Sequence, residues 1–434
     1  MRFANVEVVA EYKIMSQTIN LNDLVKRDKE NLLKGLSNNE YSLENLKTGK
    51  LIAHEGCHFI DHIATLSGMY MLQKVYNAIN ELEAFNNSPQ EKVELVNIKS
   101  LLDYFNEWKQ DKHTQVFKQV DSKFLKADYW KFNFKGAEIN YIFDKKKKPI
   151  LKLQFKMNNE VCAEVPFTIE SLWETNAMFV ELDYHLLTLL GIKDEGTNLV
   201  ETSLYNNLYK KYLYTPELFT YSVAAHLTSS FANLGVADDA FKLSKILSDI
   251  SLNLPFECYK SIKKTRGTLF NGLVNEFLEE IDELHPPVVF MALLENIMES
   301  EDFKVEKVLG NELGIDINSI LKINNLPDKE NLRIMIMKEM ESIELATVRS
   351  EINQSHLFEF FKKTGIDIFS NIGFKGYYRS SSVLFINYAC KVDNIVFQGM
   401  DEEAFYEEET QTYIRQEYFD ESFRLMQQYS DLVD

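Results

Sequence analysis

The feature that most restricts the fold is the stretch from residue 42 to residue 79, in which apolar side chains recur at spacings of three and four residues. This spacing is typical of a helix with one buried face. Ser42 offers a helix cap at its start, and a bend is expected near Ser67-Gly68. Glycine and proline, which interrupt helices, number only 16 and 8 among 434 residues. Long helices are therefore expected to dominate, and a turn-rich β architecture is disfavoured.

The rest of the chain divides into helical patterns and one group of strand patterns. Apolar runs separated by short polar turns predict a small antiparallel meander at residues 129–134, 139–143, 150–157 and 161–165. Thr168 can cap the helix that follows this meander. Helices are expected over residues 22–36, 89–118, 168–190, 216–231, 238–250, 268–284, 287–299, 328–351 and 401–432. Shorter strand-like patterns lie at 2–11, 383–388 and 394–397.

These patterns predict an α+β protein that is predominantly helical. Its expected parts are a helical core, a small antiparallel β-meander inserted before the helix at 168–190, and a helical C-terminal half. The segment 191–198, GIKDEGTN, is typical of a linker and is taken as a boundary. We therefore expect a region 1–190, a helical domain 191–365, and a mixed C-terminal segment 366–434 that packs on or covers the core.

The charge balance limits the partners that the chain can bind. Lysine and arginine number 47 against 66 aspartates and glutamates, for a formal net charge of −19. Such a surface repels a nucleic-acid backbone or an anionic membrane, so neither partner is expected. The sequence shows no secretory signal pattern and no apolar run long enough to span a membrane. Its four cysteines form no CxxC pair, and a cytoplasmic protein with unpaired thiols is expected.

Three of the eight histidines lie close together in the segment HEGCHFIDH, which begins at His54. His54 and His58 are one helical turn apart, so their imidazoles can converge on one cation, and Glu55 between them can reach a water at the metal. This is the HExxH arrangement. His62 would stand about 12 Å from His54 along the helix axis, too far to share one ion. Asp61 or His62 is expected instead to act as a partner of His58.

A third ligand must come from another part of the chain. Glu174 is preferred over Glu170, because an acid in the first turn of a helix is explained by the helix dipole. Ala177, beside Glu174, is small enough to let the histidine helix approach. Glu181, two turns further along, would lie about 10 Å from Glu174 and play an outer role. The alternatives are Glu81, if the chain reverses near residue 68, or a merely solvated stripe of glutamates.

With these residues the chain resembles the zincin superfamily of metallopeptidases, in particular its gluzincin branch, in which HExxH is joined by a glutamate on a later helix, often written ExxA. The resemblance is local and covers the HExxH segment and Glu174 to Ala177. It implies that His54, His58 and Glu174 bind Zn²⁺, that Glu55 is the general base, and that the substrate is a peptide or protein. Region 1–190 would then be the catalytic region. The segment between the two motifs is longer than in the best-known members of the family. The order of helix, meander and helix after the motif also differs from the family's usual layout, in which the sheet precedes the motif.

Two other classes of function stay open. A di-iron carboxylate oxidoreductase would use Glu55 and His58 as an ExxH pair, but it needs a second such pair, and Glu181 to His185 is spaced one residue too far. A non-enzymatic interaction protein would bind a partner through its acidic C-terminal half, and its HExxH segment would be structural. Metal analysis separates the three classes, since it would find one zinc, two irons or no metal.

A donor that stabilises an oxyanion is also needed for peptide hydrolysis. The candidates are Tyr377, Tyr378, Arg379 and Tyr413, for each of which ordinary packing is the competing interpretation. His226 is expected to be a buried helix histidine rather than a catalyst.

Overall fold

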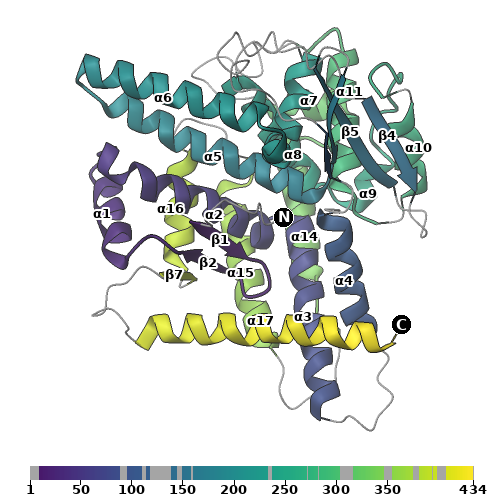
Figure 1. Cartoon of the computed structure of the whole chain (residues 1–434). Helices are drawn as coiled ribbons and strands as arrows, with labels where there is room; N and C mark the ends of the chain where they lie inside the picture. The colour runs from purple at the N-terminus through teal and green to yellow at the C-terminus, as the bar shows by residue number, and fades with distance from the viewer. Residues whose placement is uncertain are drawn as a thin grey trace.

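The computed structural model describes residues 9–87, 95–109, 114–117, 138–143, 149–157, 160–232, 237–270, 272–281, 283–303, 316–346, 354–374, 381–392, 394–397 and 407–433. Helices make up most of the described chain, and two small sheets accompany them (Figure 1). The expected α+β, predominantly helical class is confirmed. None of the described helices is long and apolar enough to cross a membrane.

The first sheet brings together segments from near the two ends of the chain. β1 (Ala10–Lys13) and β2 (Thr18–Leu21) form an antiparallel hairpin, and β7 (Ile395–Phe397) lies parallel to β2. The strand expected at 394–397 is confirmed, and the strand-like pattern at 2–11 is described from residue 9 onward. The helix expected at 22–36 is α1 (Lys26–Ser37), which is followed by the short 3-10 helix η1 (Leu43–Asn45).

The long helical pattern at 42–79 forms two helices, α2 (Leu46–Ala64) and α3 (Leu66–Asn87). The break falls at Thr65, whose backbone is extended and whose hydroxyl donates to the Asp61 carbonyl and accepts from the Gly68 amide. A methyl group at Gly68 would lie only 2.1 Å from the Asp61 carbonyl oxygen, so this turn requires glycine. The bend expected near residue 68 is confirmed as a break three residues earlier.

The meander expected before Thr168 is present in the second sheet. That sheet has the order β3-β6-β5-β4, with every pair antiparallel. Helix α4 (Val96–Lys109) precedes this sheet. The strands are β3 (Gln115–Val116), β4 (Glu138–Phe143), β5 (Pro149–Met157) and β6 (Glu160–Pro166). The strand expected at 129–134 lies outside the described residues. Thr168 caps α5 (Ile169–Gly191), as expected, by accepting from the Ser171 amide.

The second half of the described chain is almost entirely helical. Its elements are α6 (Glu195–Tyr214), η5 (Pro216–Tyr221), α7 (Val223–Ala232), α8 (Ala237–Asn253), α9 (Phe256–Tyr259), α10 (Leu273–Glu280), α11 (Pro286–Glu299), α13 (Ile317–Ile323), α14 (Lys329–Ser342), α15 (Ser355–Ile372), α16 (Ser381–Lys391) and α17 (Glu407–Val433). Three expectations for the chain are wrong. The helix expected at 89–118 ends at Lys109, and Gln115–Val116 form strand β3 instead. The strand at 383–388 is part of helix α16, and the linker at 191–198 is already helical from Glu195.

α2 lies inside the molecule and packs against α5, α15 and α16 (Figure 1). Glycines allow two of these contacts. A methyl group at Gly56 would lie 2.9 Å from the Cβ of Ala389 in α16, and one at Gly365 of α15 would lie 1.8 Å from the Ile63 carbonyl oxygen. Buried apolar residues from all three expected regions belong to one hydrophobic cluster. The division into 1–190, 191–365 and 366–434 stays a prediction.

Candidate metal centre

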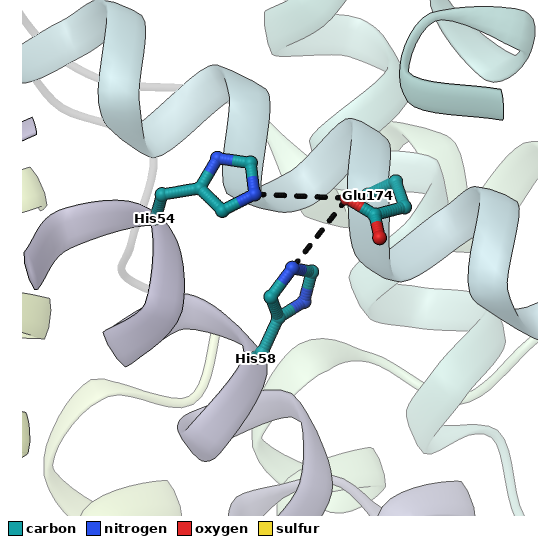
Figure 2. A group of neighbouring side chains, drawn as sticks. All are labelled: His54, His58 and Glu174. Carbon is teal, nitrogen blue, oxygen red and sulfur yellow. Dashed lines mark ion pairs between the residues drawn. The ribbon is translucent and has the colours of Figure 1, made fainter. Parts of the chain in front are cut away.

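Three side chains from two helices converge at one point (Figure 2). His54 and His58 stand one turn apart on α2, and Glu174 comes from α5. The Nε2 atoms of His54 and His58 lie 3.6 and 3.5 Å from Oε2 of Glu174. One ligand atom of each residue lies within 4.8 Å of the other two. The structure therefore brings together the three residues that the sequence analysis selected as ligands.

The separations suit a metal ion better than direct hydrogen bonds. Ligand atoms about 2.0–2.1 Å from one tetrahedral zinc stand about 3.3–3.4 Å apart, close to the distances between the imidazole nitrogens and the Glu174 carboxylate. Nitrogen–oxygen hydrogen bonds are shorter, at about 2.7–3.2 Å. Oε2 of Glu174 is buried and has no hydrogen-bond partner in the structure, so a cation would complete its coordination. The residues present fit a zinc site with three protein ligands.

A close crossing of α2 and α5 makes this convergence possible. A methyl group at Gly49 would lie 2.0 Å from Cε1 of Tyr184, so the Tyr184 ring occupies the space that a side chain at Gly49 would need. Ala177 is fully buried one turn after Glu174, which agrees with its expected role as a small residue in the α5 interface. The two helices thus approach closely at Gly49, next to the metal centre.

Glu55 follows His54 on α2 and is only 7% exposed. Burial raises the pKa of its carboxyl, charge on His54 and His58 opposes that rise, and Glu174 adds to it. These interactions place Glu55 in the electrostatic field of all three ligands. A carboxylate with a raised pKa is a better proton acceptor than an ordinary glutamate, so Glu55 has the environment expected of a general base.

The imidazole of His54 is held on both sides. Its Nδ1 lies 3.1 Å from Oε2 of Glu181, and Oε1 of Glu181 pairs with Nζ of Lys50 at 2.9 Å. Burial alone would lower the pKa of His54, but the Glu174 and Glu181 carboxylates more than offset it and hold the pKa well above its usual range. An Nδ1–H that donates to Glu181 leaves the Nε2 lone pair directed at the metal centre. The outer role expected of Glu181 agrees with this contact.

The partner expected for His58 is not found where the sequence placed it. His62 bonds instead through Nδ1 to the hydroxyl of Tyr12, at 2.9 Å, and Asp61 accepts from Nδ2 of Asn176, also at 2.9 Å. Nδ1 of His58 is buried with no hydrogen-bond partner in the structure. The ring of His58 packs between aromatic side chains, with centroids 6.4 Å from Trp173 and 6.5 Å from Tyr12. Packing therefore orients this ligand, because the neighbouring polar side chains are engaged elsewhere.

The two rival third ligands have other roles. Glu81 accepts hydrogen bonds from the backbone amides of Asn97 and Ile98 and thereby caps α4. Glu170, on α5, forms an ion pair with Lys109 of α4 at 3.5 Å. Among the described residues, the triad is the only group of three histidine, cysteine or acidic side chains close enough to share an ion. This arrangement favours a site for one metal ion.

Sequence reasoning missed Tyr221, at the end of η5. Its ring centroid lies 6.2 Å from that of His54. The carboxylate of Glu174, then burial, then Glu55 raise the pKa of Tyr221, so its hydroxyl stays protonated beside the metal centre. Tyr413 is exposed on α17, where Glu417 is its charged neighbour. Tyr377, Tyr378 and Arg379 lie outside the described residues. No motif marks Tyr221, because only the packing of η5 on α5 brings it to the site.

Comparison with known proteins found no relatives. No family model, no curated protein and no solved structure matches the chain. The functional argument therefore rests on the geometry and chemistry of the metal centre.

Proposed function

We propose that the chain is a zinc-dependent hydrolase that cleaves peptide bonds, with Glu55 as general base. The observation that carries this proposal is the convergence of His54, His58 and Glu174 beside a buried glutamate one position after the first histidine. Two imidazoles and one carboxylate form a donor set typical of catalytic zinc, which keeps a further coordination position open.

The proposed roles follow from the positions of the side chains. His54, His58 and Glu174 would hold the cation. Bound zinc would supply Lewis acidity, which polarises a carbonyl group and lowers the pKa of water. Glu55 accepts a proton from the water that attacks the peptide carbonyl and then passes this proton to the leaving amine.

Tyr221 is our candidate for the donor that stabilises the oxyanion. Its hydroxyl is protonated in the field of Glu174 and Glu55, and its ring lies next to that of His54. A neutral donor near a developing negative charge lowers the barrier of acyl transfer because the charge forms in a site already arranged for it. Tyr221 is preferred over the exposed Tyr413, and Tyr377, Tyr378 and Arg379 stay predictions from the sequence.

The first experiment measures bound metal in the purified protein. We expect about one zinc per chain and loss of zinc in His54→Ala, His58→Ala and Glu174→Gln. Glu170→Gln and His356→Ala are matched controls, because Glu170 pairs with Lys109 and His356 is exposed on α15. Full zinc retention in all three ligand variants would contradict the site, and two irons per chain would favour the di-iron class.

The second experiment measures hydrolysis with a mixed peptide library analysed by mass spectrometry. Glu55→Gln should keep its zinc but lose at least a hundredfold in rate, since an amide cannot accept the proton of water. Loss of zinc in Glu55→Gln would instead make Glu55 a ligand. If the zinc-loaded wild-type protein cleaves no peptide, the metal site stands and the peptidase activity is rejected.

A further inference from the structure

A cavity of about 340 Å³ lies away from the metal ligands. Its wall is formed by α3, α4 and α14, by the residues at the start of α5, and by the segment just before α11. None of the residues of the metal centre lines it. Two indoles in edge-to-face contact lie between the cavity and the metal centre. Trp108 lines the cavity and packs against Trp173 at 5.4 Å, and Trp173 packs against His58 at 6.4 Å.

Aromatic side chains supply much of the cavity wall. Tyr70, Tyr104, Trp108, Phe167 and Phe256 all contribute to it. The face of an aromatic ring attracts a cation, most strongly when the cation is only partly hydrated. One ring already does so within the protein, since Nζ of Lys74 lies 5.6 Å from the centroid of Tyr104. The wall can therefore accept an ammonium group against its rings.

The charge of the lining also favours a cation. Glu107, Glu283 and Glu339 line the cavity, against the single ammonium group of Lys74. Burial raises the pKa of Tyr104, and the charges of Glu107 and Glu283 raise it further, so these carboxylates act on the same ring. Glu339 accepts a hydrogen bond from the hydroxyl of Tyr70 at 2.9 Å. The lining thus has two more carboxylates than ammonium groups.

The lining suits an organic cation better than a metal ion. The three cavity glutamates do not form a group close enough to share an ion, since the triad at the metal centre is the only such group in the described part of the chain. A volume of about 340 Å³ also suits a small molecule.

From these observations we propose that the cavity binds an organic ammonium ion, with its charged group against the aromatic wall and the carboxylates. The ammonium group of Lys74 competes with the ligand for the same ring face. This site is independent of the proposed hydrolase activity, because it uses none of the metal ligands and none of the groups that act on the peptide bond.

Isothermal titration calorimetry of the full chain tests the proposal with three probes. Choline carries a quaternary ammonium group, n-butylammonium a primary one, and 3,3-dimethylbutanol is the neutral isostere of choline. We expect at least one of the two cations to bind with a Kd in the millimolar range or tighter, and the neutral alcohol to bind at least tenfold more weakly. The tighter cation identifies the ammonium class. Binding of the neutral alcohol as tight as that of the preferred cation, or no binding of either cation, would overturn the proposal.

Variants of the lining make the test specific to this cavity. Tyr104→Leu and Glu283→Gln should weaken binding of the preferred cation at least threefold, and Glu283 is exposed, so its replacement by glutamine should not affect folding. Lys74→Met should strengthen binding, because it removes the competing ammonium group. His58→Ala should leave the affinity unchanged, which separates this site from the metal centre. Identical affinities in Glu283→Gln, Lys74→Met and the wild-type protein would contradict the assignment.

Discussion

At the scale of single residues, the proposed metal centre would depend on groups other than its three ligands. His54 needs its Nδ1 protonated so that Nε2 can bind a cation, and Glu181 provides the acceptor for that proton at 3.1 Å. Lys50 in turn neutralises Glu181 from the far side, at 2.9 Å. Burial raises the pKa of Glu181, but His54 and Lys50 hold it well below its usual range. The carboxylate therefore stays charged and keeps the imidazole in one tautomer and one orientation.

Replacing Glu181 by glutamine should weaken zinc binding without removing a ligand. An amide is uncharged and fixes the His54 tautomer less strongly, so we expect an affinity about 10- to 100-fold lower, measured by competition with a chelator. Lys50→Met is the matched control, because it leaves the contact between Glu181 and His54 in place and should cost less. A zinc affinity equal to that of the wild-type protein in Glu181→Gln would remove Glu181 from the site.

Replacing Tyr221 by phenylalanine separates catalysis from metal binding. The ring that packs near His54 remains, but the hydroxyl donor is lost, so zinc should still bind. We expect kcat to fall about 10²- to 10³-fold, the usual cost of losing one oxyanion donor, while KM changes little. The readout is steady-state hydrolysis of a peptide found with the wild-type protein. A rise in KM with unchanged kcat would make Tyr221 a residue of substrate binding instead.

The convergence of the triad could be predicted from the sequence, whereas most of its surroundings could not. HExxH has helical spacing, and a distal acid beside a small residue was enough to select Glu174 over Glu81 and Glu170. The contacts of Glu181 and Tyr221 depend on how α5 packs against α2 and how η5 packs against α5, and no local pattern records that packing. His58 shows the same limit, since the groups expected to orient it bind Tyr12 and Asn176 instead.

At the scale of elements, α2 is held by helices that come from distant parts of the chain. α5 crosses it at Gly49, α16 packs at Gly56, and α15 places Gly365 against the Ile63 carbonyl. Each contact brings a helix closer than any larger residue would allow. The positions of the metal ligands are therefore set by backbone spacing as well as by the ligands themselves.

A methyl group in the crossing of α2 and α5 should affect both stability and metal binding. In Gly49→Ala the new Cβ would stand 2.0 Å from the ring of Tyr184, so one of the two helices must shift. We expect a loss of about 1–3 kcal/mol in the free energy of unfolding, together with weaker zinc binding because Glu174 moves with α5. Denaturant titration of the metal-free protein and a zinc competition assay measure the two effects.

Gly196→Ala, in α6, is the control for this change. The nearest atom to a methyl group at Gly196 is Oδ2 of Asp194, at 3.4 Å, an ordinary contact. There the alanine should stabilise the helix by up to about 1 kcal/mol, with no effect on zinc. Equal stabilities of Gly49→Ala and the wild-type protein would show that the crossing is looser than the structure implies.

The elements that were predicted well have a local sequence signal such as a helix cap, and the wrongly predicted segments 383–388 and 191–198 have no such signal. Thr168 caps α5 as expected, and α14 begins directly after Asp328, at the expected start of its helix. The run at 383–388 was assigned to a strand because a short apolar run has no clear period. In the structure this run belongs to α16, whose buried residues follow helical spacing and include Ser382, Phe385, Ile386 and Ala389. The glycines of segment 191–198 predict a linker, but Asp194 accepts from the Thr197 amide, and α6 begins directly after it.

At the scale of the whole molecule, the C-terminal elements complete the layers around α2, the helix that carries His54 and His58. β7 extends the N-terminal sheet, and α17 crosses α3 in the view of Figure 1 and contacts both α3 and α4. The hydroxyl of Tyr418 on α17 bonds to Glu83 of α3, and Thr18 of β2 donates to Gln416 of α17. Because these contacts join residues hundreds of positions apart, we expect folding to be slow compared with that of helical proteins built from local contacts.

Buried histidines give the whole molecule a stability that depends on pH. His226 is 7% exposed, its Nε2 donates to the Leu213 carbonyl at 2.6 Å, and its ring packs against Phe155 and Phe219. Burial lowers the pKa of His226 to about 4, against about 6.5 in the unfolded chain. The unfolded state therefore binds a proton first as the pH falls. This contribution to stability is complete above pH 6.5 and is lost progressively between about pH 6.5 and pH 4.

The variant His226→Gln tests this dependence, because a glutamine amide can donate to the Leu213 carbonyl but does not titrate. Between about pH 7.5 and pH 5.5 the wild-type protein should lose about 1.4 kcal/mol of unfolding free energy through this histidine. Other groups change both proteins alike, so the wild-type protein should lose about 1.4 kcal/mol more than the variant. Denaturant titrations at the two pH values measure the difference. Equal losses in the two proteins would mean that His226 takes up its proton in the folded state as easily as in the unfolded chain.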